Sequence, residues 1–136
     1  MAGSVLVDTG FLIALLNRRD RHHKWAASQA RELIPPWQTC DAVLSEAFHL
    51  LEQGRRSWLL TLLTRNAVIP AFSLGNERDA VFNLMQKYAD VPMSLADACL
   101  VRMTEVLAEP LVLTTDRDFH VYRRHSRQIV PCATPF

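Results

Sequence analysis

Short apolar runs alternate along this chain with longer segments in which apolar residues recur every three or four positions. Runs with the length and composition of strands occupy residues 4–7, 37–40, 67–72 and 111–114, and residues 128–130 are a candidate fifth strand. The helical spacing covers residues 9–16, about 21–33, about 42–53, 56–64, 77–88 and 95–107. This alternation predicts an α/β fold whose central, mostly parallel sheet is covered by helices on both faces.

Composition narrows the class of protein. The 136 residues are the length of one ordinary domain, and 49% hydrophobic with 21% charged residues excludes general disorder. The net charge of +1 excludes a strongly basic nucleic-acid-binding coat but not a local basic patch. No signal peptide is expected, because no Lys or Arg precedes the first apolar run, and no run approaches the ~20 residues that cross a bilayer. With three scattered cysteines, we expect a cytoplasmic protein with reduced thiols and no membrane contact.

Four of the fourteen acidic residues lie in apolar surroundings. Asp8 directly follows one predicted strand, and Asp116 follows another. Glu46 and Asp97 lie within apolar segments, where we expect them in the first turns of two helices that begin near the same edge of the sheet. Ligands bind at the carboxyl ends of parallel strands, so these four side chains are the candidate site.

Each acid also has a structural interpretation, which the sequence leaves open. Asp8 and Asp116 suit the N-cap position of a following helix, Ser94 with Asp97 matches a capping box, and Glu46 suits a solvated helix surface. Four converging carboxylates, however, would repel one another unless a cation neutralised them. An all-oxygen set favours Mg²⁺ or Mn²⁺ over zinc, and carboxylate-held divalent ions are a common means of hydrolysing phosphodiesters.

Four segments together resemble the PIN domain family. They are VLVDTGFLIALL at 5–16, VLSEA at 43–47, LADA at 95–98 and LTTDRDF at 113–119, in the family's order and spacing over essentially the whole chain. In length and wording the chain is most similar to the VapC-type toxins of bacterial toxin–antitoxin pairs. The resemblance implies a single PIN-like nuclease domain over residues 1–136, with a three-layer α/β/α fold and about five strands.

The same resemblance implies an activity and a set of site residues. It implies Mg²⁺- or Mn²⁺-dependent cleavage of single-stranded RNA, a cognate antitoxin protein as partner, and a homodimer. The family's acidic site positions, which serve as catalytic and metal-binding residues, fall on Asp8, Glu46, Asp97 and Asp116, with Asp118 as an alternative to Asp116. Positions where the family often carries a hydroxyl near the site fall on Thr9 and Thr115.

Other features keep two interpretations each. The basic runs at 18–24 and 123–127 suit phosphate contact or a solvated surface, and the apolar helix at 56–64 suits a buried core helix or a groove for a partner. Two further function classes also remain. One is a PIN-like RNA- or protein-binding module without catalysis. The other is a phosphatase or phosphotransferase with Asp8 as nucleophile, which usually needs a second acid two residues later, where this chain has Gly10.

Overall fold

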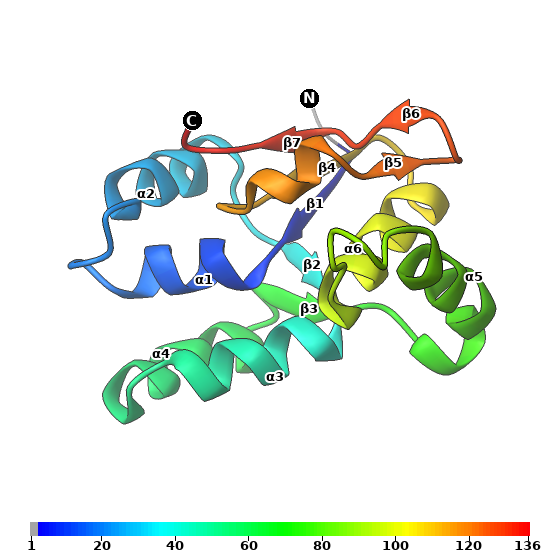
Figure 1. Ribbon diagram of the computed structural model, residues 1–136. Coiled ribbons are helices and arrows are strands. Elements are labelled where there is room, and N and C mark those ends of the chain that lie inside the picture. Colours follow the sequence, from blue (N-terminus) through cyan, green and yellow to red (C-terminus); the bar gives the residue numbers. More distant parts are fainter. Residues whose placement is uncertain (1–2) are drawn as a thin grey trace.

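A five-stranded parallel sheet forms the centre of the protein (Figure 1), in a computed structural model that describes residues 3–136. Its strand order is β3–β2–β1–β4–β7, and all four pairings are parallel. The strands are β1 (Ser4–Val7), β2 (Trp37–Thr39), β3 (Val68–Pro70), β4 (Pro110–Leu113) and β7 (Cys132–Ala133). The predicted α/β fold with a parallel sheet of about five strands is confirmed.

Six α-helices connect and cover these strands. They are α1 (Thr9–Leu16), α2 (His23–Glu32), α3 (Asp41–Leu50), α4 (Gln53–Thr64), α5 (Leu74–Lys87) and α6 (Leu95–Val106). The connections from β1 to β2 to β3 contain α1 to α4, and the connection from β3 back to β4 contains α5 and α6. Figure 1 shows α1 and α2 on one side of the sheet and α5 and α6 on the opposite side, which gives three layers.

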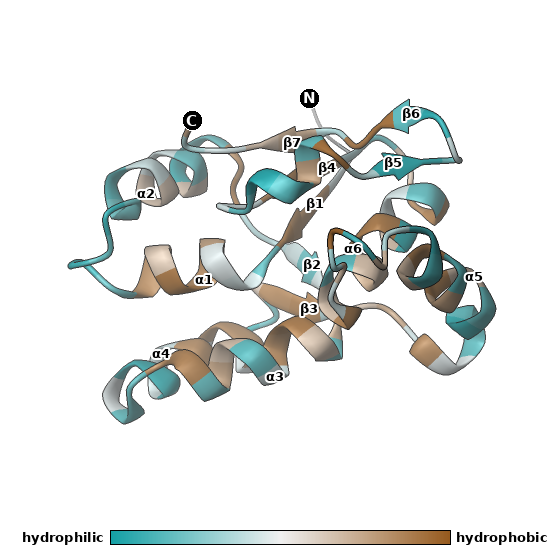
Figure 2. Cartoon of the chain, viewed as in Figure 1, coloured by the Kyte–Doolittle hydropathy of each residue, from teal (hydrophilic) through white to brown (hydrophobic). Residues whose placement is uncertain are grey.

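The neighbouring strands β1 and β4 are apolar, as expected for strands that are buried on both faces. They pair in register from Ser4 with Pro110 to Val7 with Leu113. Figure 2 shows β1 as a hydrophobic strand in the middle of the molecule, whereas the β5–β6 hairpin at its margin is hydrophilic. This register brings the chain out of both strands side by side, at the same edge of the sheet.

The expectation of a fifth sheet strand at residues 128–130 is wrong. Residues Gln128–Ile129 form β6, which pairs antiparallel with β5 (Arg123–Arg124) in a separate hairpin. His125 and Ser126 take positive φ angles of 48° and 70° and turn the chain back on itself. The chain therefore returns to the central sheet only after the hairpin, where Cys132–Ala133 pairs with β4 as the fifth strand.

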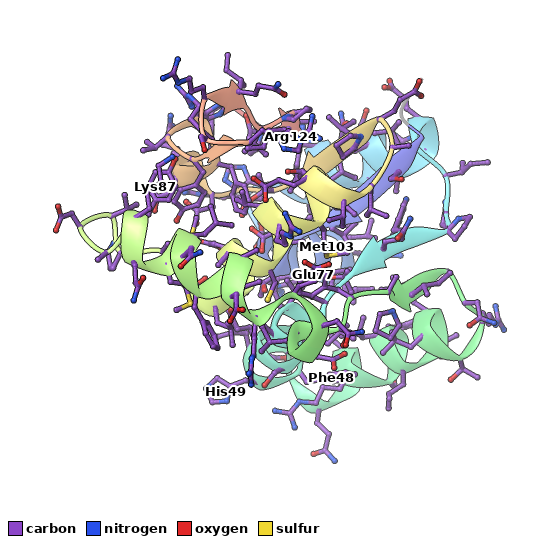
Figure 3. The ribbon with its side chains drawn as sticks, turned by 90° about the vertical axis from the view of Figure 1, so that its right-hand side faces the viewer. Phe48, His49, Glu77, Lys87, Met103 and Arg124 are labelled. Atoms are coloured by element: carbon purple, nitrogen blue, oxygen red, sulfur yellow. The ribbon has the colours of Figure 1, made fainter. Side chains whose placement is uncertain are left out.

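Hydrogen bonds connect the hairpin to both helices of the α5–α6 layer, through Lys87 and Arg124, which Figure 3 labels. Arg124 Nη2 donates to the Thr104 carbonyl of α6, and Lys87 Nζ of α5 donates to the Ser126 carbonyl at 3.0 Å. Arg123 Nη1 donates to three backbone carbonyls, those of residues 120, 121 and 122. Two arginines of the second basic run are thus engaged within the fold itself.

Several helix boundaries differ from those predicted. Helix α5 begins at Leu74 rather than residue 77, because Ser73 takes the N-cap position and its Oγ accepts from the Asn76 amide at 3.4 Å. Helix α3 ends at Leu50, since Leu51 is extended with φ −77° and ψ 137°. Helices α2 and α4 begin at residues 23 and 53 rather than about 21 and 56.

Helix α4 lies between the two interpretations that its sequence left open. Leu59 is fully buried, whereas its neighbours Trp58 and Leu60 are 64% and 53% exposed. One side of α4 therefore belongs to the core and the other presents apolar side chains to the surface. Among residues 3–136, no helix is both long and apolar enough to cross a membrane.

The aromatic centre of the core generates a stability prediction. Phe11 is fully buried and meets Trp25 and Trp37 edge to face, with centroid distances of 5.9 and 5.5 Å. Phe11→Ala should lower the free energy of unfolding by about 3–5 kcal/mol, measured by urea denaturation followed by circular dichroism. Phe82→Ala, at a 48% exposed position, is the matched control and should cost less than about 1 kcal/mol. Equal losses in the two variants would contradict this description of the core.

Candidate active site

The carboxyl edge of the sheet holds a cavity between β1 and β4. The chain crosses from β1 to β2 on one side and reaches β4 on the other, so this is the point where the strand order reverses and where α/β folds bind ligands. The cavity has a volume of about 580 Å³. Its acidic lining comes from Asp8, Asp20, Glu46, Asp97, Asp116 and Asp118. The structure thus brings the four predicted acids, and the alternative Asp118, to one cavity.

Asp8 is both a helix cap and a member of the cavity wall. It is the N-cap of α1, where its Oδ1 accepts from the Thr9 amide at 2.7 Å, and its Oδ2 accepts from Thr114 Oγ1 at 2.7 Å. Burial raises the pKa of Asp8 to about 7, and the charges of Asp97 and Asp116 add to this rise, while the two hydrogen bonds oppose it. The capping interpretation is therefore correct for Asp8, and the same side chain lines the cavity.

Asp97 occupies the first turn of α6. Ser94 is the N-cap, with its Oγ accepting from the Asp97 amide at 3.0 Å, and the buried phenol of Tyr122 donates to Asp97 Oδ2 at 2.8 Å. Burial raises the pKa of Asp97, as do the charges of Asp116 and Glu46, and the hydrogen bond from Tyr122 opposes the rise. A carboxylate whose pKa responds to two other acids shares a common electrostatic environment with them.

Two residues that hold the acids were not predicted from the sequence. Tyr122 packs edge to face against Phe119 with a centroid distance of 5.3 Å, so its hydroxyl is fixed toward Asp97. Thr114 Oγ1 donates to Asp8 and accepts from the Asp116 amide at 3.0 Å, so it links two of the acids. The sequence did offer a signal for Thr114, because this residue lies between β4 and Asp116. Nothing in the sequence indicated that Tyr122 reaches α6.

The two predicted hydroxyl positions have other contacts. Thr9 Oγ1 donates to the Val43 carbonyl at 3.4 Å, which joins α1 to α3. Thr115 lines the cavity and lies against Gly10, where an added Cβ would overlap Thr115 Oγ1 and approach its Cβ to 3.2 Å. Gly10 is therefore required by the close approach of the β4 turn to α1.

The remaining acids sit nearer the mouth of the cavity. Asp116 is the N-cap of the 3₁₀ helix η1 (Arg117–His120), and its Oδ1 accepts from the Asp118 amide at 2.8 Å. Burial and the charge of Asp116 raise the pKa of Asp118. Glu46 is exposed and lies in the second turn of α3, not the first turn as expected. Both Asp116 and Asp118 border the cavity, so the structure leaves either available as the fourth acid.

The positive charge in the cavity lining comes from Arg21, in the first basic run. Its neighbour His22 also lines the cavity and accepts a hydrogen bond from Arg21 Nε through Nε2 at 3.1 Å. Across the described residues 3–136, none of the salt bridges involves the four predicted acids. The repulsion among these acids is therefore offset by hydrogen bonds, and by the protons that the raised pKa values of Asp8 and Asp97 favour, and not by ion pairs.

The donor chemistry of the cavity fits a hard divalent cation. The converging groups are carboxylate oxygens and hydroxyls, which suit Mg²⁺ or Mn²⁺, and the cavity supplies no thiolate. Within residues 3–136, no group of three or more Asp, Glu, His or Cys side chains is arranged to hold a metal ion by itself. Mg²⁺ takes few protein carboxylates and fills its shell with water and phosphate oxygens, so its binding does not require such a group.

The raised pKa of Asp8 predicts a pH dependence of stability in metal-free buffer. Between about pH 4 and pH 7 the unfolded chain has lost this proton while the folded protein retains it, so folding becomes less favourable as pH rises through this range. Relative to wild type, Asp8→Asn should gain up to roughly 4 kcal/mol in the free energy of unfolding between pH 4 and pH 8. Urea denaturation in chelator at several pH values measures this difference. A gap that stays constant with pH would contradict the buried, protonated state of Asp8.

The contact between Gly10 and Thr115 predicts a coupled pair of substitutions. Gly10→Ala should cost about 1–3 kcal/mol of stability, because the new methyl group overlaps Thr115. In a Thr115→Ala background the same substitution should cost much less, which a double-mutant cycle measures. Gly54→Ala in α4 is the matched control, since nothing lies within 4 Å of its added Cβ, and it should be neutral or stabilising. Independent, additive losses at residues 10 and 115 would refute the contact.

The family of the chain follows from its sequence as a whole. Residues 5–124 match the family model of the PIN domain, a span that includes Asp8, Glu46, Asp97, Asp116 and Asp118. No curated protein matches the chain significantly. PIN domains use divalent metal ions, in keeping with the oxygen-rich cavity. The chain belongs to the PIN domain family, a family of metal-dependent nucleases.

Proposed function

We propose that this protein is a divalent-metal-dependent endoribonuclease that cleaves single-stranded RNA. The observation that supports it most is the convergence of Asp8, Asp97 and Asp116, from three separate segments, on one cavity. Besides burial, the charges of Asp97 and Asp116 raise the pKa of Asp8, and the charge of Asp116 raises the pKa of Asp97. Such a concentration of like charge destabilises the fold, but it favours the binding of a cation, which in turn binds a phosphate.

The proposal assigns three roles to side chains at the cavity: holding the cation, orienting the acids and binding phosphates. Bound Mg²⁺ or Mn²⁺ supplies the charge that activates water and stabilises the leaving oxygen of a phosphodiester. Asp8, Glu46, Asp97 and Asp116 would hold the cation, with Asp118 as the alternative to Asp116. Thr114 and Tyr122 keep Asp8 and Asp97 oriented through hydrogen bonds of 2.7 and 2.8 Å. Arg21 and His22 would bind phosphates that flank the scissile one.

The sequence after Asp8 argues against the phosphotransferase alternative. The residue two positions after Asp8 is Gly10, which carries no acid to protonate a leaving group. The binding-module alternative does not account for acids gathered where a bound RNA would bring further negative charge.

We also propose that the protein is the toxin of a toxin–antitoxin pair and forms a homodimer. The surface of α4 supports a protein partner, because the exposed Trp58 borders a groove of about 840 Å³ between α4 and the end of α1. Leu15, Leu16 and Trp58 give this groove apolar walls, and Arg18 and Arg19 give it positive charge. Arg55 also lines the groove, where it pairs with Glu52 at 2.6 Å. An amphipathic segment with acidic flanks would complement it.

The nuclease proposal predicts the effect of removing single carboxylates. Asp97→Asn and Asp8→Asn should each reduce Mg²⁺-dependent cleavage of single-stranded RNA by at least roughly 100-fold, since each removes a charge needed for cation binding. Gel-resolved cleavage of a labelled RNA measures the loss. Asp90→Asn, at an exposed acid outside the cavity, is the matched control and should cleave at the wild-type rate.

Three results would count against the proposal. Undiminished cleavage by either cavity variant would show that the carboxylates do not hold the cation. RNA binding without cleavage at any Mg²⁺ or Mn²⁺ concentration would favour the binding module. A phosphorylated Asp8 trapped from a phosphate ester would favour the phosphotransferase.

A further inference from the structure

A second cavity lies along the same sheet edge, next to the candidate active site. Where the acidic cavity follows β1 and β4, this one follows β2 and β3: Cys40 and Asp41 come directly after β2, and Phe72 comes two residues after β3. The Ala71 amide donates to the Thr39 carbonyl at 3.1 Å and holds this turn against β2. Glu46 lines both cavities, so they adjoin at this side chain.

The second cavity differs from the first in its chemistry. It has a volume of about 490 Å³, within the range of small-molecule sites. Buried Cys40, Ala96 and Cys99 form its floor, and the partly exposed apolar side chains of Phe72, Leu74 and Leu95 form its walls. The exposed polar residues of the lining, Asp41, Ser45 and Glu46, all belong to α3. A flat group with an apolar face and a polar edge matches this lining.

We propose that this cavity binds one nucleobase of the RNA strand, the base attached to a nucleotide beside the scissile phosphate. The inference rests on the proposed ribonuclease activity and adds to it a specificity subsite. The shared Glu46 supports this proposal, because it shows that the two cavities adjoin. An RNA chain whose scissile phosphate lies at the ends of β1 and β4 would place a neighbouring base further along the same sheet edge. Sequence-selective proteins read single-stranded RNA by stacking splayed bases on aromatic side chains and bonding their edges.

The polar side of the cavity selects among bases. An ionised carboxylate accepts hydrogen bonds and cannot donate them, so Asp41 favours a base edge rich in N–H donors. Guanine presents two adjacent donors, N1–H and the N2 amino group, which match the two oxygens of a carboxylate. The subsite therefore prefers guanine over uracil, with Phe72 against the base face and Asp41 at the base edge.

The same lining argues against a second protein chain as the occupant. An aliphatic or aromatic side chain inserted here would cover Asp41 and Ser45 without bonding them, and burying unpaired polar groups is costly. A nucleobase covers the apolar walls and satisfies the polar side together.

The test uses uridine hexanucleotides that carry one guanosine, one inosine or no substitution at a fixed position. Wild-type protein with Mg²⁺ should cut the guanosine substrate at one bond fixed relative to the guanine, with kcat/KM at least roughly ten-fold above the all-uridine substrate. Phe72→Ala should lower kcat/KM for the guanosine substrate by roughly 5- to 100-fold and for the all-uridine substrate by less, because the smaller uracil ring stacks less extensively on Phe72. Asp41→Asn should abolish the preference for guanosine over inosine, which lacks the N2 amino group. Phe82→Ala, an exposed aromatic of α5 outside the cavity, is the control.

The outcomes separate this inference from the proposed function. Cleavage that is indifferent to the base, or equal losses on all substrates in Phe72→Ala, would overturn the subsite and leave the nuclease intact. Retained guanine preference in Phe72→Ala together with dissociation of a dimer, seen by light scattering, would assign the cavity to a second copy and overturn the inference. If the wild type cuts no RNA, the proposed function fails. Titration with guanosine monophosphate then tests the cavity alone: NMR shifts confined to residues 40–46, 72–74 and 95–99 support the base site, and no shifts at millimolar nucleotide refute it.

Discussion

Repulsion among carboxylates at one sheet edge is the constraint that the rest of the structure must meet. Asp8 and Asp97 are buried near further acids, and no lysine or arginine of the described chain forms a salt bridge with them. Hydrogen bonds do the offsetting instead, from the Thr114 hydroxyl, the Tyr122 phenol and backbone amides at helix starts. Burial, together with the repulsion that these bonds do not offset, raises the pKa of both acids, so the site favours the binding of a positive charge.

Local structure and site chemistry share the same atoms here. Asp8 begins α1 and Asp116 begins η1 as N-caps, and each cap fixes a carboxylate at the end of a central strand. One oxygen of each cap bonds a backbone amide, which orients the other. A structural explanation of an acid is therefore no argument against its place in a site, because the cap is what aims the side chain.

The sheet edge is divided by chemistry along the strand order. Its β1–β4 part is acidic and suits a cation with a phosphate, and its β2–β3 part is apolar and suits a flat neutral group. Glu46 lies between the two and belongs to both. The parallel arrangement makes this possible, because four strands deliver their following residues to one edge in side-by-side order.

The sequence by itself determined the element order and four of the acids. Buried strands need continuous apolar runs and helices need a repeating apolar stripe, so both leave local patterns, and acids at the ends of such runs stand out. Tertiary structure alone decided which residues support them: Thr114 lies 106 positions from Asp8, and Tyr122 lies 25 from Asp97. It also decided that Glu46 is exposed, that residues 132–133 complete the sheet and that a second cavity exists. Strand register and helix crossover set these relations, and neither has a local signature in the chain.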